Sequence, residues 1–390
     1  MDRREYTVGD CFYQIRNGAN IKQGDAAGGY PITRIETTAN DTFNRDRMGY
    51  AGITDLSKYE GYVLEDGDLL MSHINSVQYL GRTVLYRKQG DETIIHGMNL
   101  LSLKANREII LPEFARYSFR SDPFKKQLSK ITKKSVNQAS FTVADLKKIV
   151  LFVPPLCRQK EIVQNLDKCR SIAAMRQQQL SALDDLIKAR FVEMFGSIKE
   201  EQLLEDISEF VTVGIANSAT HAYAESGIPM LRNQNIKENY LDDTDLIYIK
   251  PEFAAKYESK KLKENDIIAM RTGYPGIACL VPKKYEGCQT FTTLIVRLKA
   301  GNNPSYVCSY INSDLGKRFI ESGKVGVAQQ NFGAKSLAKM PVKIAPKVLQ
   351  DDYADFVKQV DKSKSVIQKS LDETQLLFDS LMQKYFGEMN

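Results

Sequence analysis

The chain contains one pattern twice, with the second copy offset by just under half of its 390 residues. Segment 64–70 reads LEDGDLL and segment 262–268 reads LKENDII, an offset of 198 residues (262 − 64). Further matches follow in chain order at slowly falling offsets: 31–34 with 229–232 at 198, 103–105 with 298–300 at 195, 121–122 with 313–314 at 192, and Phe141, Leu146 and Pro155 with Phe332, Leu337 and Pro346 at 191. Solenoid repeats are only about 20 to 50 residues long. A period this long therefore predicts two duplicated domains.

Each copy begins with short apolar runs that are rich in β-branched residues and broken by Gly, Asp, Asn and Pro, a pattern typical of strands and turns. We expect strands at 61–71, 82–86, 99–104, 266–270, 276–281 and 293–298. A short helix opened by proline follows in each copy, at 112–120 and 304–312. Each copy is therefore predicted to be a compact mixed α+β domain.

Each copy ends in a long segment with the apolar spacing of a coiled coil. The first, 159–195, contains neither proline nor glycine, and 349–386 repeats its rhythm. The predicted helix seam consists of Leu166, Ala173, Leu180, Ile187, Val360, Ile367, Leu371, Phe378 and Leu381. At about 1.5 Å per residue, each helix is on the order of 50 Å long. Arg176, Lys364 and Thr374 interrupt the seam, which we expect to fix its register at some cost in stability.

The order of these segments sets the expected architecture. We predict a globular domain at 1–153, a helix at 154–196, a second globular domain at 197–345 and a second helix at 346–390. Since the second helix starts where the second domain ends, it must run back along the first helix to pair with it. The sequence therefore predicts an α+β fold with an antiparallel coiled coil and a pseudo-twofold axis. A DNA duplex has the same relation between its strands.

Composition narrows the class of protein. No apolar run reaches the roughly 20 residues that span a membrane, and no positively charged leader opens the chain, so we expect a cytoplasmic protein with no membrane contact. The net charge of +6 permits nucleic-acid binding without requiring it. The six cysteines form no C-x-x-C pair and the three histidines are scattered, so we expect reduced thiols and no metal site.

Motifs for catalysis are also missing from the sequence. No G-x-G-x-x-G follows a predicted strand and no G-x-x-x-x-G-K-[ST] occurs. Segment 302–306, NNPSY, is similar to the N-P-P-Y motif of adenine methyltransferases. Its Pro304 matches Pro112 of the first copy, so a helix start explains it more simply. We expect no catalytic residue on this chain.

The long segments resemble a known family. Residues 154–162, PPLCRQKEI, and 186–196, LIKARFVEMFG, are similar to the first conserved region of the specificity subunits of type I restriction–modification enzymes. The order of domains and helices resembles that family over the whole chain. Segment 345–350, APKVLQ, departs from the pattern because it keeps the glutamine and one proline but lacks the double proline. Arg158 stands where an acidic residue is common before the glutamine.

This resemblance implies a protein without catalysis of its own that reads an asymmetric, bipartite sequence in double-stranded DNA. Each domain would read one half-site, and the helices would fix the gap. Two modification subunits, which bind S-adenosylmethionine and methylate adenine, and restriction subunits, which consume ATP with Mg²⁺, are the implied partners. No cofactor is expected on this chain itself.

Two alternatives stay open. The alternatives to a specificity subunit are a non-catalytic coiled-coil interaction scaffold and the DNA-reading part of another methyltransferase-type defence complex. Failure of the purified complex to retain DNA would favour the scaffold. A stand-alone methyltransferase would instead require S-adenosylmethionine binding by the isolated chain.

Positions where the two copies differ nominate base contacts. After the matched arginines, the first copy has IET at 35–37 and the second has NQN at 233–235, and amides pair with adenine edges. A second surface precedes each long helix, where lysines and amides suit phosphate contacts. The candidate DNA-contact residues are Arg34, His73, Asn75, Arg82, Lys133, Lys134, Asn137, Gln138, Arg232, Asn233, Gln234, Asn235, Arg271, Lys324, Gln329, Gln330 and Asn331. An ordinary polar turn or a solvated basic loop explains any one of them equally well. Tyr274 is expected to pack inside the fold.

Overall fold

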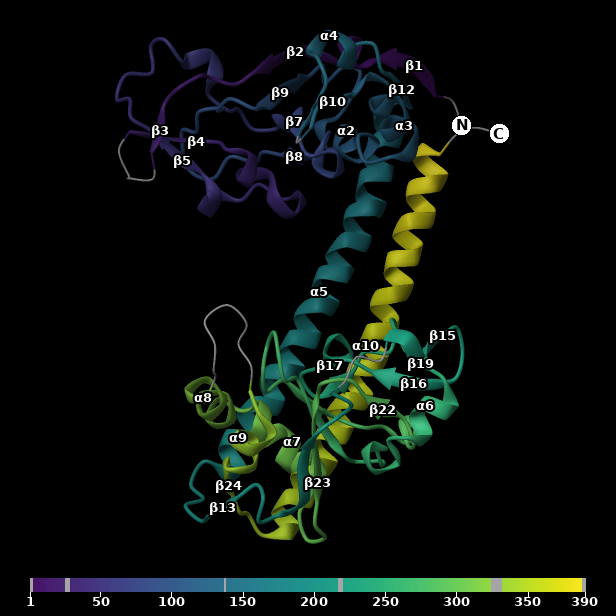
Figure 1. Ribbon diagram of the computed structural model, residues 1–390. Helices are drawn as coiled ribbons and strands as arrows, with labels where there is room; N and C mark the ends of the chain where they lie inside the picture. Colours follow the sequence, from purple (N-terminus) through teal and green to yellow (C-terminus); the bar gives the residue numbers. More distant parts are fainter. Residues whose placement is uncertain (1–2, 25–28, 137, 217–219, 324–331, 388–390) are drawn as a thin grey trace. The chain divides into compact units, whose positions relative to one another are not determined.

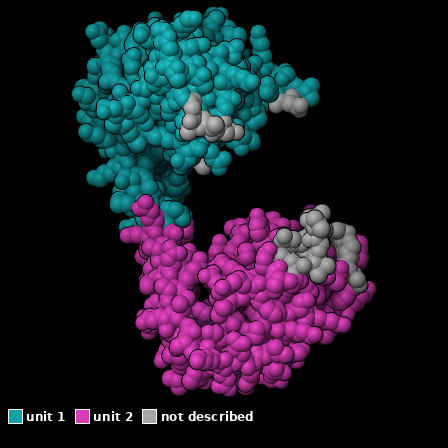
Figure 2. All heavy atoms as spheres, turned by 90° about the vertical axis from the view of Figure 1, so that its left-hand side faces the viewer, with its two compact units in different colours: residues 1–177, 369–390 teal, residues 178–368 magenta. Residues whose placement is uncertain are grey.

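A computed structural model describes residues 3–24, 29–136, 138–216, 220–323 and 332–387 of the chain (Figure 1). The chain divides into two compact units, Met1–Gln177 with Lys369–Asn390, and Gln178–Gln368 (Figure 2). Each long helix contributes one half to each unit. Each unit thus joins one of the predicted globular domains to parts of both predicted helices. Among the described residues, no helix is both long and apolar enough to cross a membrane.

Unit 1 is built on a four-stranded antiparallel sheet in the order β2-β9-β6-β8. These strands are β2 (Phe12–Asn17), β9 (Leu100–Ala105), β6 (Leu69–Ser72) and β8 (Thr83–Leu85). The helices α2 (Pro112–Ser118) and α3 (Asp122–Ile131) pack on this sheet through Phe114, Tyr117 and Phe124, all buried in one core. The smaller elements are β1 (Arg4–Thr7), α1 (Val8–Cys11), β3 (Gln23–Gly24), β4 (Tyr30–Ile32), β5 (Gly49–Ala51), β7 (Ile74–Asn75), β10 (Lys133–Lys134), β11 (Ala139–Ser140), α4 (Val143–Leu146) and β12 (Val150–Val153).

Unit 2 repeats this plan in the order β14-β23-β20-β21. Its strands are β14 (Ser208–Val213), β23 (Leu294–Leu298), β20 (Ile267–Ala269) and β21 (Ala278–Leu280), and its helices are α7 (Pro304–Asn312) and α8 (Asp314–Ser322). The smaller elements are β13 (Glu201–Leu203), β15 (Tyr223–Ala224), β16 (Ile228–Leu231), β17 (Ile236–Lys237), β18 (Tyr240–Leu241), β19 (Ile247–Ile249), α6 (Pro251–Ala255), β22 (Gln289–Thr290), α9 (Ala334–Ala338) and β24 (Pro341–Lys343). Two mixed α/β units on one plan confirm the predicted duplication.

Strand register corrects the repeat alignment in one place. Leu69 pairs with Leu103, and its equivalent Ile267 pairs with Val296, so the offset here is 193 residues (296 − 103). The predicted match of 103–105 with 298–300 is therefore wrong by two residues. Ion pairs with the equivalent buried aspartates show that Lys104 and Arg297 are the matching residues, and loop-length changes account for the shifted offset. Lys104 lies 3.2 Å from Asp68, whereas Arg297 lies 2.6 Å from Asp266.

The predicted strand at 61–71 is also mostly wrong. Residues before Leu69 form a 3₁₀ turn and a loop, and β6 begins only at Leu69. Gly67, two residues before β6, has φ of +96°, a turn conformation that a regular strand cannot contain. The Asp68 carboxylate then accepts the Glu65 N–H at 2.9 Å and closes the turn. The other five expected strands and both short helices are present, within a few residues of their predicted ends.

The two predicted long helices are present as α5 (Leu156–Phe195) and α10 (Lys347–Phe386). Buried and half-buried side chains recur at steps of three and four, and all nine predicted seam residues are among them. In unit 1 Asn165, early in α5, donates to the Tyr385 hydroxyl at the end of α10, at 3.1 Å. In unit 2 Phe191, late in α5, lies edge-on to Tyr353 near the start of α10. The helices therefore run antiparallel within each unit.

A buried glutamine fastens the start of each long helix to its own domain. The Gln159 side chain accepts the Leu111 N–H at 2.8 Å and donates to the Ile109 and Pro154 carbonyls. Gln350 accepts the Asn303 N–H at 2.8 Å and donates to the Ala345 carbonyl. These bonds hold the loop before the short proline-opened helix against the first turn of the long one.

Candidate nucleic-acid interface

In unit 1 a small three-stranded sheet, β10-β11-β7, gathers several predicted contact residues. Strand β11 pairs with β7 through Ala139 opposite Asn75, and with β10 through the same Ala139 opposite Lys134. Residues about 60 positions apart in sequence therefore share one surface. The side chains of Lys133, Lys134 and Gln138 are exposed on it. Two ammonium groups and an amide at one hairpin suit phosphate and base-edge contacts.

His73 lies beside this sheet but faces the interior. It is 7 % exposed, its ring contacts Phe141 with centroids 6.3 Å apart, and burial lowers its pKa. A buried neutral imidazole is a poor base reader, so the predicted base contact of His73 is not supported by its placement. Its equivalence to Arg271 is confirmed, because the Phe141 N–H donates to the His73 carbonyl and the matching Phe332 N–H donates to the Arg271 carbonyl.

The matched arginines hold loops within each unit. Arg34 donates from Nε to Gln23 Oε1 at 2.9 Å and from Nη2 to the Gly24 carbonyl. Arg232 binds both the carboxylate and the carbonyl of Asp245. Guanidinium groups with internal partners have fewer donors left for DNA. Arg34 and Arg232 therefore act first as braces of the loops that follow them.

Those loops adopt the same 3₁₀ turn in both units, η1 (Ile35–Asp41) and η6 (Asn233–Asn235). The third residue is structural each time, since Thr37 accepts the Arg34 N–H at 2.8 Å and Asn235 accepts the Arg232 N–H at 2.9 Å. Asn235 is 2 % exposed and donates to two carbonyls, so its predicted base contact is contradicted by burial. Only the first two residues of each turn, Ile35 and Glu36 in unit 1 and Asn233 and Gln234 in unit 2, remain as candidates for base contacts.

Unit 2 brings Asn233 and Arg271 together. The Asn233 amide donates to Thr272 Oγ1 at 2.9 Å and accepts the Arg271 N–H at 3.3 Å. Gln234 is exposed beside them, with its amide 2.5 Å from an Asp245 carboxylate oxygen. A half-buried arginine next to two amides can present donors and acceptors to base edges. In this cluster Arg271 is the counterpart of His73, whereas Asn233 and Gln234 are the counterparts of Ile35 and Glu36.

Two exposed side chains at these loops were missed or misjudged from sequence. Val136 is 99 % exposed at the tip of the β10–β11 hairpin, where an apolar side chain has no packing role. Tyr274, expected to pack inside, is 75 % exposed, because Gly273 with φ of +81° turns the loop outward. Exposed apolar groups here fit thymine methyl contact or base stacking. The Gly-Tyr-Pro run after β20 is the sequence signal for an exposed turn.

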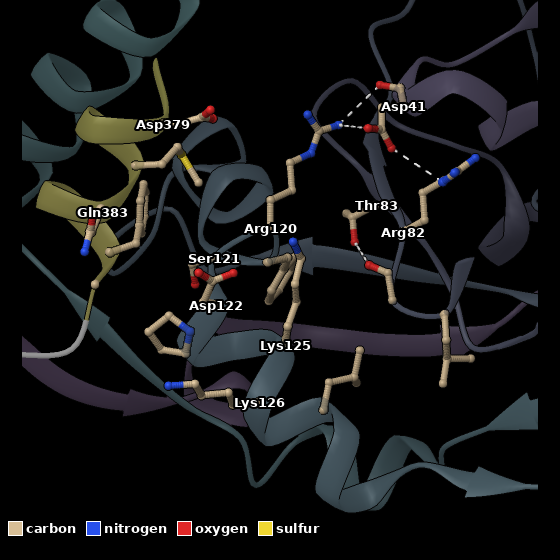
Figure 3. A pocket seen from close by; sticks show the side chains of 18 of the residues that line it. Asp41, Arg82, Thr83, Arg120, Ser121, Asp122, Lys125, Lys126, Asp379 and Gln383 are labelled. Atoms are coloured by element: carbon tan, nitrogen blue, oxygen red, sulfur yellow. Dashed lines mark hydrogen bonds and ion pairs between the residues drawn. The ribbon is translucent and has the colours of Figure 1, made fainter. Parts of the chain in front are cut away.

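Two further candidates in unit 1, Asn75 and Arg82, have partners within the unit. Asn75 binds within its own turn, accepting the Ser76 N–H and donating to Ser72. Arg82 lies 3.5 Å from Asp41 and 4.5 Å above the Tyr79 ring, across that carboxylate from Arg120 (Figure 3). Its neighbours place it in a groove separate from the β7 sheet. The predicted contacts Asn137, Lys324, Gln329, Gln330 and Asn331 lie outside the described residues.

Comparison with known proteins gives two kinds of match. Residues 4–184 and 199–374 match the family described as type I restriction modification DNA specificity domain. The putative type I restriction enzyme MjaX specificity subunit of Methanocaldococcus jannaschii is 34% identical over 215 residues, covering 53% of this chain and 50% of that protein. The type I restriction enzyme EcoKI specificity subunit of Escherichia coli K12 is 24% identical over 169 residues, covering 43% and 36%. The matches thus span half or less of these curated relatives.

Two solved structures have the same fold. One, described as "Structural basis underlying complex assembly and conformational transition of the type I R-M system", has a TM-score of 0.59 at 16% identity and covers 98% of this chain and 97% of that chain. The crystal structure of a type-I restriction-modification system S subunit from M. genitalium has a TM-score of 0.57 at 14% identity, covering 100% and 97%. At these identities the likeness shows the fold alone.

Proposed function

Because the chain belongs to the family of type I restriction–modification DNA specificity domains, we propose that it reads a bipartite, asymmetric DNA target with one unit per half-site. The observation that carries this proposal is the pairing of equivalent loops with different side chains. Where unit 1 has Ile35 and Glu36, unit 2 has Asn233 and Gln234, on the same 3₁₀ turn. One scaffold with two sets of hydrogen-bonding groups suits two different half-sites.

The contacts divide into positioning and reading. Lys133 and Lys134, exposed on β10, would bind phosphate oxygens, which orient the protein without specifying sequence. Gln138 in unit 1, and Asn233, Gln234 and Arg271 in unit 2, would bind base edges. Arginine to guanine is the commonest specific contact, worth about 1–3 kcal/mol of discrimination. We expect unit 2 to depend most on Arg271.

The remaining roles belong to partners. The chain itself would be non-catalytic and cytoplasmic, and the α5–α10 pair would fix the unspecified gap between half-sites. Two modification subunits carrying S-adenosylmethionine would methylate adenine in the bound target. Restriction subunits, using ATP and Mg²⁺, would add cleavage. The names of the matched relatives as restriction-enzyme specificity subunits support this assignment.

A domain exchange tests the proposal. Residues 197–345 are replaced by the corresponding segment of another specificity subunit, and the sequences bound by the purified complex are selected from random DNA. We expect one half-site to change while the other is kept. Loss of both half-sites together, or an unchanged pair, would mean that the units do not read separately. The Arg271→Ala variant is the finer version, with relaxed preference expected in the same half-site.

A further inference from the structure

Each unit contains a groove between its second short helix and the last turns of a long helix. Groove 1, in unit 1, has a volume of about 900 Å³ and lies between α3 and the end of α10 (Figure 3). Groove 2, in unit 2, has a volume of about 450 Å³ and lies between α8 and the end of α5. Neither groove contains a residue of the unit 1 sheet or the unit 2 loop cluster proposed to bind DNA.

The two grooves are copies of one site. Positions 378, 379, 382, 383, 386 and 387 of α10 and its end line groove 1, and the positions 191 residues earlier (378 − 187) all line groove 2. On the opposite wall, positions 120–123, 125 and 126 line groove 1, and those 192 residues later (312 − 120) all line groove 2. A chance hollow would not use equivalent positions on both walls in both units.

The wall geometry is also kept. Gly81 has φ of +77°, and a Cβ there would lie 2.4 Å from Leu128 of α3. Its counterpart Gly276 has φ of +94°, with Ile320 of α8 at 2.3 Å. Both glycines let the helix pack directly on the turn. The helix that forms each groove wall is therefore held in the same position in both units.

The floors of the two grooves share one side-chain contact, which is an ion pair in groove 1 and a neutral hydrogen bond between amides in groove 2. In groove 1 Arg120 lies 3.7 Å from Asp41, whereas in groove 2 the Asn312 amide donates to Asn239 Oδ1 at 2.8 Å. Asp41 and Asn239 both have positive φ, +58° and +67°, so the same turn presents each acceptor. An ion pair and an amide pair thus bridge the same two elements. The bridge is structural, and the ligand must be recognised by the groove walls.

The walls combine apolar groups with charged ones, and cations outnumber carboxylates in both linings. Groove 1 has four cations (Arg82, Arg120, Lys125 and Lys126) and three carboxylates (Asp41, Asp122 and Asp379). Groove 2 has four cations (Lys188, Lys317, Arg318 and Lys343) and two carboxylates (Glu238 and Asp314), and Lys317 lies 2.9 Å from Glu238. Exposed cations follow the first turn of each short helix, Lys125 and Lys126 on α3 and Lys317 and Arg318 on α8. The long helix supplies apolar side chains, and in groove 2 Val192 is 66 % exposed. A phosphate backbone offers nothing to an apolar wall. A protein segment with one apolar face and acidic side chains complements both walls.

We propose that the two grooves dock two copies of the same acidic, amphipathic segment of a partner protein, one copy in each unit. Both grooves keep cations on the short helix and apolar side chains on the long helix, so one partner species bound twice fits both. This inference rests on the proposed function, under which that partner is the modification subunit, and it specifies the surface and its chemistry.

Site-specific photo-cross-linking tests the proposal directly. A benzophenone side chain is placed at Val192 or at the equivalent Gln383, both exposed, in the complex of the full chain with its modification subunit and DNA. Tyr13, 69 % exposed on β2, is the control position. We expect both groove positions to capture one and the same acidic, apolar segment of the modification subunit. Capture of two unrelated segments, of DNA, or of nothing would overturn the proposal.

Charge reversal gives an independent readout. Lys125→Glu with Lys126→Glu should weaken binding of one modification subunit by about tenfold or more, and adding Lys317→Glu with Arg318→Glu should weaken both. Native mass spectrometry counts the subunits, and circular dichroism checks folding. The exposed pair Lys147→Glu with Lys148→Glu is the matched control. Unchanged stoichiometry with intact DNA specificity would contradict the docking proposal but leave the proposed DNA-reading function standing. Loss of DNA affinity at full stoichiometry would mean that the grooves bind DNA instead.

Discussion

At the scale of single residues, Gln159 and Gln350 show why a glutamine follows the proline at the start of each long helix. The motif marks this residue in the sequence, but its partners are loop atoms nearly 50 residues away. Such contacts have no local signal, so their existence was not predictable. The same limit explains His73 and Asn235, whose residue types suggested DNA contacts while their burial gives them roles inside the fold.

Replacing Gln159 should therefore destabilise unit 1. Gln159→Ala leaves the Leu111 N–H and two carbonyls without partners in a buried site, at a cost of about 1–3 kcal/mol for an unsatisfied group. Urea unfolding of the full chain measures the change. Gln177→Ala, at an exposed position of the same helix, is the control and should alter the unfolding free energy by less than about 0.5 kcal/mol. Equal effects of the two variants would show that the Gln159 hydrogen bonds do not stabilise unit 1.

Burial of His96 predicts a pH dependence. Burial lowers its pKa from 6.5 to about 4, so only the neutral ring fits the fold. Above pH 6.5 both states are neutral. Between pH 6.5 and 4 the unfolded chain takes up a proton that the folded chain refuses, so the unfolding free energy falls by up to roughly 1.4 kcal/mol per pH unit.

The variant His96→Gln isolates this effect, because an amide does not titrate but can still donate to the Leu100 carbonyl, which His96 Nε2 contacts at 2.9 Å. Unfolding free energies are measured at steps from pH 7 to 4. We expect the wild-type slope to exceed that of the variant in this window. Parallel curves would show that His96 is not the titrating group.

At the scale of elements, periodicity decided what the sequence could predict. The heptad spacing of α5 and α10 is a local property, and every predicted seam residue is buried or half-buried. The two-residue strands β7, β10 and β11 have no such signal, because they exist only through pairing with distant partners. The surface that gathers Lys134, Gln138 and Asn75 was therefore predictable residue by residue but not as one site.

Leu180 tests the seam itself. Its side chain is 8 % exposed at a predicted seam position, whereas Leu186, on the same helix, is 47 % exposed. Leu180→Ala should cost about 2–4 kcal/mol of unfolding free energy through lost burial and the cavity left behind. Leu186→Ala should cost less than about 1 kcal/mol. Thermal and urea unfolding compare them, and a larger loss from Leu186→Ala would contradict the assigned helix faces.

At the scale of the whole molecule, the duplicated plan explains both the likeness and the difference of the units. Matched features such as the glutamine clamps and the turn glycines maintain one scaffold. Differing features, Arg271 against His73 and two amides against Ile35 and Glu36, vary what each unit presents. The duplication was evident from sequence, although loop-length changes made the alignment of β9 with β23 wrong by two residues.

The helix pair should act as a ruler between half-sites. Deleting one heptad from each helix, 174–180 and 368–374, keeps the seam in register because the period is seven. We expect selected DNA targets to keep both half-sites and to change only the gap between them. Deletion in one helix alone is the control, since it removes the pairing partners of the other and should reduce complex yield. An unchanged gap in the paired deletion would show that other elements set the spacing.

The central claim is that this chain determines which DNA sequence a methylating complex recognises. Methylome sequencing of the host with and without this gene tests it most directly. We expect one bipartite adenine-methylation motif, made of two different half-sites around a fixed gap, to disappear with the gene and return with a plasmid copy. Loss of no such motif, in a host that expresses the modification subunit, would contradict the account.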